Sequence, residues 1–197
     1  MGEMFDLSFY FKGKREKKKP SFTVLRELGL KEGKNRITDS EYPLFAEREV
    51  QFITYDYDDA DFFLHVLHLE NLVFTKSNLE KKINQLLQVV DICFSQSEEI
   101  MFASGIYEMT GNYIGGNIKR KDLNATILSH FPILFFRKGQ EQGFHPSYNL
   151  NDTYCVLNLN KPTVQDIFAN PIMELMENEG LCYEEAYVKY YRSEEKI

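Results

Sequence analysis

Two histidines that lie close together in the sequence are the first residues whose type and spacing could hold a metal ion. His65 and His68 are three positions apart, and Glu70 follows them. On a helix the two imidazoles would share one face and could bind zinc or another transition metal. The surrounding run of Phe, Leu and Val is instead typical of a β-strand, in which an odd spacing sends two side chains to opposite faces. We therefore predict no metal pair here.

An acidic segment just before these histidines is the second candidate for ion binding. Asp56, Asp58, Asp59 and Asp61 supply the oxygen ligands that Mg²⁺ and Ca²⁺ prefer. A calcium-binding loop needs an acidic or amide ligand and then glycine where this chain has Ala60 and Asp61. The sequence therefore favours a solvated turn between two strands, with no bound metal and no cofactor.

Motifs for nucleotide binding and for nucleophilic catalysis are incomplete or absent. The glycine-rich segment 111–118 has the two glycines of a phosphate-binding loop, but Asn117 and Ile118 stand where that loop needs Lys and Ser or Thr. The sequence contains no G-x-S-x-G and no H-E-x-x-H pattern. The three cysteines are widely spaced and are expected to be packed, reduced thiols: Cys93, Cys155 and Cys182. These observations favour a protein that is not an enzyme.

A short basic segment is suited to phosphate groups. Residues 12–19 hold six of the 23 basic residues and one of the 30 acidic residues. The six are Lys12, Lys14, Arg15, Lys17, Lys18 and Lys19. The segment has no interleaved aromatic side chains on which bases could stack. Because the whole chain has a net charge of −7, which opposes general binding to nucleic acid or anionic membranes, we predict a solvated loop.

An aromatic stripe near the end of the chain could dock a protein partner. Tyr183, Tyr187 and Tyr190 recur at helical spacing, and acidic residues surround them. A tyrosine-rich face with an acidic rim suits partner binding, although a stripe packed on the chain's own sheet has the same spacing. The pattern Leu-Met-Glu-x-x-Gly-Leu-x-x-Glu-Glu-Ala over residues 175–186 is similar to a helix-turn-helix unit of several small bacterial accessory proteins, including antitoxin-like ones. This similarity carries no functional residues to the chain.

Hydrophobic periodicity outlines the elements that must position these residues. The most regular helix covers residues 78–94, where Ile83, Leu86, Leu87 and Val90 recur on one face. Ser77 and Glu80 predict a capping box at its start. Strands are predicted over residues 4–11, 49–55, 62–69, 99–109, 133–136 and 153–159, and a short helix over 122–130. The alternation within 4–11 indicates a half-buried strand, and Gly105 marks a bulge or a close approach of two strands.

These elements predict an α+β fold: a mainly antiparallel sheet, the helix of residues 78–94 packed on it, and a helical C-terminus. We expect one compact domain over residues 1–197, with 163–197 as a helical subregion. A hydrophobic share of 43% and a charged share of 27% exclude the disordered, collagen-like and transmembrane classes. No secretory leader is visible, so we expect a cytoplasmic protein.

The function that best fits these observations is that of a non-enzymatic interaction protein with a protein partner, such as an immunity- or antitoxin-like inhibitor from a bacterium or phage. Its support is an acidic body, abundant tyrosine and the lack of a catalytic or cofactor motif. The alternative is an enzyme or small-ligand protein whose site assembles from distant residues. The first candidates for that site are Asp56, Asp58, His65 and His68.

Overall fold

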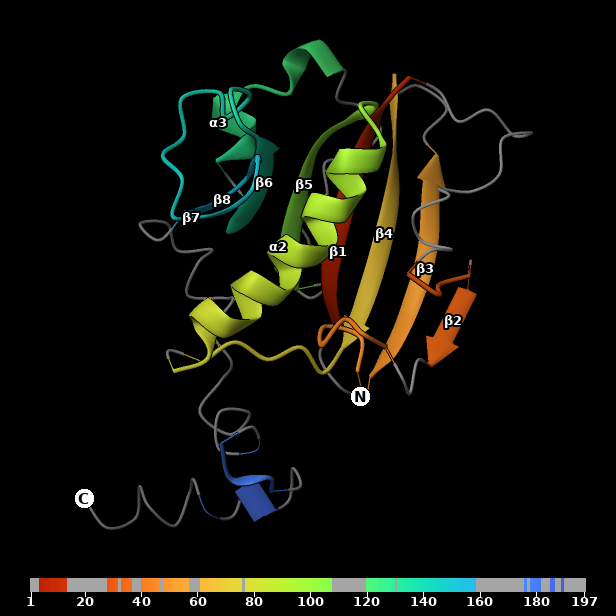
Figure 1. The fold of residues 1–197 in the computed structure, drawn as a ribbon, viewed down its shortest axis with the longest axis vertical. Helices are drawn as coiled ribbons and strands as arrows, with labels where there is room; N and C mark the ends of the chain where they lie inside the picture. Colours follow the sequence, from red (N-terminus) through yellow and green to blue (C-terminus); the bar gives the residue numbers. More distant parts are fainter. Residues whose placement is uncertain are drawn as a thin grey trace.

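The computed structural model describes most of the first 158 residues and a few positions after them. The described residues are 4–13, 28–31, 33–36, 40–46, 48–56, 61–75, 77–107, 120–129, 131–158, 176, 178–181, 185–186 and 189. Eight strands in these ranges form one antiparallel sheet in the order β2-β3-β4-β1-β5-β6-β8-β7 (Figure 1).

The strands are β1 (Met4–Lys12), β2 (Gly33–Arg36), β3 (Glu49–Asp56), β4 (Phe62–Glu70), β5 (Ile100–Tyr107), β6 (Ile133–Arg137), β7 (Tyr148–Leu150) and β8 (Thr153–Leu157). The described helices are α2 (Leu79–Gln96) and α3 (Ala125–Leu128), with a 3₁₀ turn, η2 (Arg120–Asp122), before α3. The fold is therefore α+β with an antiparallel sheet, as predicted. No helix within the described ranges is long and apolar enough to cross a membrane.

Six strands and the long helix lie within two residues of the predicted bounds, and β3 and β4 form the expected hairpin. The edge strands β2 and β7 were not predicted, because three or four residues are too few for an alternating pattern to show. The predicted helical C-terminus over residues 163–197 lies largely outside the described residues.

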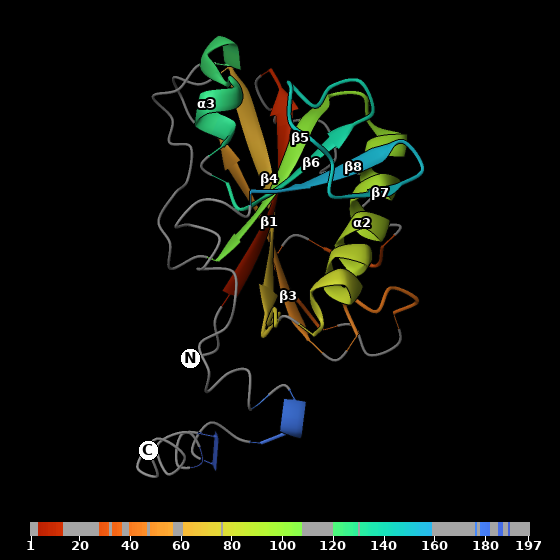
Figure 2. The same cartoon turned by 90° about the vertical axis from the view of Figure 1, so that its left-hand side faces the viewer.

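Helix α2 covers one face of the sheet and contacts β6, β7 and β8 (Figures 1 and 2). Its buried side chains are Ile83, Leu86, Leu87, Val89, Val90, Cys93 and Phe94. They join apolar residues of the sheet in the larger of two core clusters. The predicted inward face of the helix is confirmed, since all four of its defining residues belong to this cluster.

A second, smaller cluster lies on the opposite face of the sheet. It includes Tyr10 and Phe102, whose rings stack with centroids 4.2 Å apart, and Leu128 of α3. Strand β1, which occupies the centre of the sheet between β4 and β5, is therefore buried on both faces from Phe5 to Phe11. The prediction of a half-buried strand was wrong, because polar residues such as Asp6 and Ser8, which alternate with the phenylalanines, are buried as well.

The start of α2 also differs from the prediction. The N-cap is Asn78 rather than Ser77, and its side chain makes no capping hydrogen bond into the helix. Asn78 Oδ1 instead accepts a hydrogen bond of 2.8 Å from the backbone N–H of Thr75, and Ser77 Oγ lies 2.9 Å from Thr75 Oγ1. These polar side chains stabilise the turn before the helix, so the capping box of Ser77 and Glu80 does not form.

Candidate functional site

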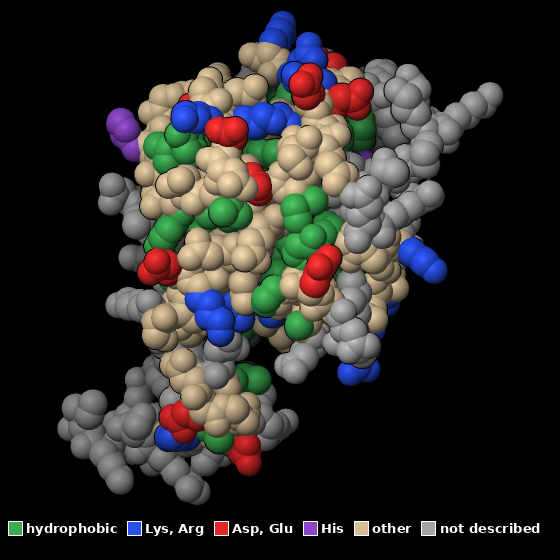
Figure 3. Space-filling model, in the orientation of Figure 1, with side chains coloured by type: hydrophobic (Ala, Val, Ile, Leu, Met, Phe, Trp, Pro, Cys, Tyr) green, Lys and Arg blue, Asp and Glu red, His purple; other side chains and the backbone are tan. Residues whose placement is uncertain are grey.

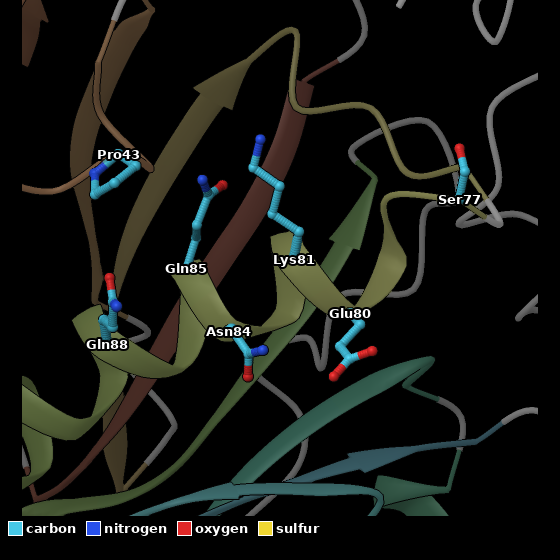
Figure 4. A pocket seen from close by; sticks show the side chains of 7 residues that line it. All are labelled: Pro43, Ser77, Glu80, Lys81, Asn84, Gln85 and Gln88. Carbon is cyan, nitrogen blue, oxygen red and sulfur yellow. The ribbon is translucent and has the colours of Figure 1, made fainter. Parts of the chain in front are cut away.

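A polar groove runs along the outer surface of α2, between the helix and the turn that contains Pro43 (Figure 4). Its volume is about 510 Å³, and most of its lining side chains are exposed. The lining residues are Pro43, Ser77, Glu80, Lys81, Asn84, Gln85 and Gln88. Figure 4 shows the side chains of Lys81, Gln85 and Gln88 on the side of the helix that faces Pro43, whereas Glu80 and Asn84 point the other way.

Both walls of this groove are anchored in the core. The turn carrying Pro43 continues into Leu44 and Phe45, which are fully buried, and the backbone N–H of Phe45 donates a hydrogen bond of 3.0 Å to the carbonyl of Tyr42. The opposite wall belongs to α2, whose other side is core. Because neither wall can shift without disturbing packed side chains, the groove is preformed.

One of the lining residues, Gln85, has a buried and unpaired acceptor. Its Oε1 atom is buried and has no hydrogen-bond partner among the described residues, although the side chain as a whole is only partly buried. In native structures most buried polar atoms are hydrogen-bonded, because an unpaired atom loses its hydrogen bonds to water and gains none in return. Gln85 Oε1 is therefore an unsatisfied acceptor that lies beneath the surface of the groove, out of reach of solvent.

The two histidines of β4 lie on opposite faces of the sheet. His65 faces the larger cluster, where its ring contacts those of Phe11, Phe52 and Phe63, and its Nδ1 lies 2.8 Å from Thr54 Oγ1. His68 is on the other face. In a β-strand, side chains at an odd spacing point to opposite faces, so the two rings do not meet at one ion.

His68 forms a buried pair with Asp6. Its Nδ1 hydrogen-bonds Asp6 Oδ1, and the two residues are direct partners in the β1–β4 register. One of these two groups donates the proton of this hydrogen bond and the other accepts it. The sequence did not point to Asp6, because a polar residue between Phe5 and Leu7 is expected to face solvent until the strand pairing is known.

Two serines extend this polar cluster across the next strand. Ser8 and Ser104 are partners in the β1–β5 register, and Ser104 Oγ is buried with no hydrogen-bond partner among the described residues. Asp6 and Ser104 are 0% exposed, Ser8 is 1% exposed and His68 is 4% exposed. A carboxylate, an imidazole and a hydroxyl are the groups of acyl-transfer catalysis, but at this burial a substrate does not reach them.

Of the remaining predicted site residues, the structure describes Asp56 and Lys12, and neither lines the groove. Asp56 ends β3 opposite Phe63, and Asp58 is outside the described residues. Within the described ranges no three His, Cys, Asp or Glu side chains gather as metal ligands. Lys12 is exposed at the end of β1, while the rest of the basic segment lies outside the described residues, as do Tyr183, Tyr187 and Tyr190.

Two of the cysteines are free and buried, as expected for packed thiols. Cys93 lies on the inner face of α2 and Cys155 on β8. Burial raises the pKa of both thiols far above its usual range, because the thiolate would lose its hydration. Neither residue is therefore a nucleophile in the folded protein.

The described residues thus offer one open, preformed polar groove on α2 and one closed polar cluster inside the sheet. The surface around α2 carries interspersed acidic and basic side chains rather than a large area of one sign (Figure 3). Comparison of the chain with protein-family models, with curated proteins and with solved structures found no match.

Proposed function

We propose that this chain is a non-enzymatic interaction protein that binds a protein partner through the groove on α2. The observation that carries the proposal is the open polar groove itself, whose two walls, the 40–46 turn and α2, are each anchored in the core. A groove whose walls are held by the core lowers the conformational cost of binding.

The charge of the chain supports this proposal. A net charge of −7 opposes binding to nucleic acid and favours a partner that has a basic surface. An inhibitor of the immunity or antitoxin type is the kind of interaction protein that fits, acting as a single domain over residues 1–197. Two free, buried cysteines are typical of proteins in a reducing compartment, which supports a cytoplasmic location as part of this proposal.

The enzyme alternative is less well supported. It would use the histidine candidates of the sequence, of which His68 is paired with Asp6 and His65 with Thr54. Both histidines are at most 4% exposed, and neither lines the groove. Their hydrogen bonds and burial favour a structural role within the sheet.

The proposed function is tested by isolating the partner and mapping where it binds. The full chain, immobilised, is exposed to extract of its native host, and each candidate is then purified and tested alone for a complex of defined stoichiometry. Hydrogen exchange of the complex should show protection at residues 79–88 and 40–46. The proposal is wrong if no purified protein forms such a complex, or if protection maps to neither segment.

The tyrosine stripe is a second proposed contact with the same partner. Truncating Tyr183, Tyr187 and Tyr190 to alanine together should weaken binding with little change in melting temperature, since exposed aromatic anchors act mainly in association. A strongly lowered melting temperature would show that the stripe is core instead, because each large buried aromatic contributes about 3 kcal/mol or more.

A further inference from the structure

Strands β1 and β4 are neighbours in the middle of the sheet, but no turn joins them. Strand β1 ends at Lys12 and β4 begins at Phe62, so the chain between them is far longer than the roughly two to five residues of a hairpin loop. In a hairpin the turn fixes which residues of the two strands lie opposite each other. The register of β1 and β4 must therefore be fixed by the side chains of the strands themselves.

The apolar side chains of β4 do not fix this register, because β4 is buried on both faces from Phe62 to Leu69. One face carries Phe63, Leu67 and Leu69, and the other carries Phe62, Leu64 and Val66. Moving β1 by two residues along β4 keeps every side chain on its own face. Phe9, which lies opposite His65, would then lie opposite Phe63 or Leu67, which are apolar. The hydrophobic pattern therefore distinguishes the observed register only weakly from its nearest alternatives.

One polar pair does distinguish these registers. Asp6 and His68 lie opposite each other, hydrogen-bond through Oδ1 and Nδ1, and are 0% and 4% exposed. After a shift of two residues, Asp6 would lie opposite Val66 in one direction and Glu70 in the other. A buried carboxylate beside an apolar side chain or a second carboxylate has lost its hydration without gaining a donor from that neighbour. Of the three registers, only the observed one places the imidazole of His68 opposite Asp6.

The other neighbour of β1 is aligned by shape instead. Gly105 of β5 leaves room for the ring of Phe5, since a Cβ atom at this glycine would lie 2.6 Å from Cζ of Phe5. Gly105 is the only glycine of β5, so a shift of two residues would bring Ala103 or Tyr107 to the place that the ring needs. Strand β4 contains no glycine that could act in this way.

We infer that the buried Asp6–His68 pair is a conformational device that selects the register of β1 against β4. The pair acts by selection more than by stability, because replacing a buried polar pair with apolar side chains of similar volume is often neutral for stability. Strand β1 contributes side chains to both core clusters, so its alignment decides which residues meet in each. The inference is independent of the proposed function and holds whatever the partner is.

The test compares the full-length wild type by NMR with a double variant that combines Asp6→Leu and His68→Leu. Contacts between backbone protons show the register directly, because Leu7 lies opposite Leu67 in the observed register and would lie opposite His65 or Leu69 after a shift. The double variant should fold and give at least two sets of signals for β1 and β4, whereas the wild type gives one set. The control Ser8→Ala should keep one set, since it removes a buried hydroxyl from β1 and leaves the pair intact.

A second variant reverses the pair by combining Asp6→His with His68→Asp, and it should keep the single register of the wild type. The inference is overturned if the double leucine variant gives one set of signals with the contacts of the wild type. It is also overturned if that variant does not fold, because the pair would then stabilise the sheet rather than select its register. Signals of two registers in the reversed variant would equally count against it.

Discussion

Replacing Gly105 by alanine tests how closely β1 and β5 are packed. A Cβ atom at this position would lie 2.6 Å from Cζ and 3.2 Å from Cε1 of Phe5, and 3.4 Å from Cβ of Ile133. Carbon atoms in good contact are about 3.5–4.0 Å apart, so the methyl group overlaps the Phe5 ring. Phe5 is fully buried, and its ring centroid is 5.2 Å from that of Phe74, so the ring cannot move away without displacing its neighbour.

Two opposing effects determine how much Gly105→Ala changes the free energy of unfolding. Alanine restricts the unfolded chain more than glycine does, which by itself would stabilise the protein by about 0.4–1 kcal/mol. Inserting a methyl group into a packed core costs about 1–3 kcal/mol. Since the overlap with Phe5 is severe, the second effect is larger, and we expect Gly105→Ala to lower the free energy of unfolding by about 1–2 kcal/mol. The melting temperature should fall by roughly 2–8 °C.

Urea denaturation followed by circular dichroism measures the change, and Phe5→Leu reveals its cause. The double variant of Gly105→Ala with Phe5→Leu should be more stable than the two single effects predict, with a coupling of about 1 kcal/mol, because the smaller side chain relieves the overlap. Gly139→Ala is the control: its strain arises from a φ of +84°, with no atom within 4 Å, so it should be additive with Phe5→Leu. A midpoint for Gly105→Ala equal to or above that of the wild type would refute the reasoning.

Three further changes test other parts of the fold. Leu87→Ala removes a fully buried side chain from the inner face of α2 and should cost about 2–5 kcal/mol; an unchanged urea midpoint would mean that the helix face is misplaced. Arg137 donates to the carbonyls of Phe94 and Ile100 and lies over the Phe94 ring, so Arg137→Lys, which keeps the charge but not the planar fork, should cost about 1–3 kcal/mol in the same assay. Cys93 and Cys155 should resist alkylation at pH 8 until urea unfolds the protein, as mass spectrometry of labelled peptides would show; rapid labelling of the native form would contradict their burial. Because burial raises the pKa of both thiols in the folded state, only the unfolded chain loses these protons above about pH 9, and stability should fall as the pH rises past that value.

The local elements of this fold were predictable because short-range patterns specify them. The run from Ile83 to Phe94 has the spacing of one helix face, and the alternation around Phe63 and Leu67 has that of a strand. Gly105 was predicted to mark a bulge or a close approach, and the structure shows a close approach by the ring of Phe5. These signals need no knowledge of what the element packs against.

The candidate site was not predictable in the same way. Gln85 and Gln88 carry no functional signal in the sequence, and only the packing of the 40–46 turn beside α2 places them in a groove with Pro43. His68 was considered for metal binding with His65, three residues away, whereas its partner is Asp6, 62 residues away. The number of residues between two side chains in the sequence does not predict whether they pair in this way.

The sequence by itself therefore determined the type of each long element, the inward face of α2, the antiparallel α+β class and the acidic charge of the chain. Periodicity and composition can be read directly from the sequence, and folding does not change them. Only the tertiary structure decided that β1 is central and buried on both faces, that Asp6 pairs with His68, and that an acceptor on Gln85 is left unpaired beside Pro43. Each of these depends on strand order, register or the approach of distant segments, which arise from the simultaneous packing of the whole core.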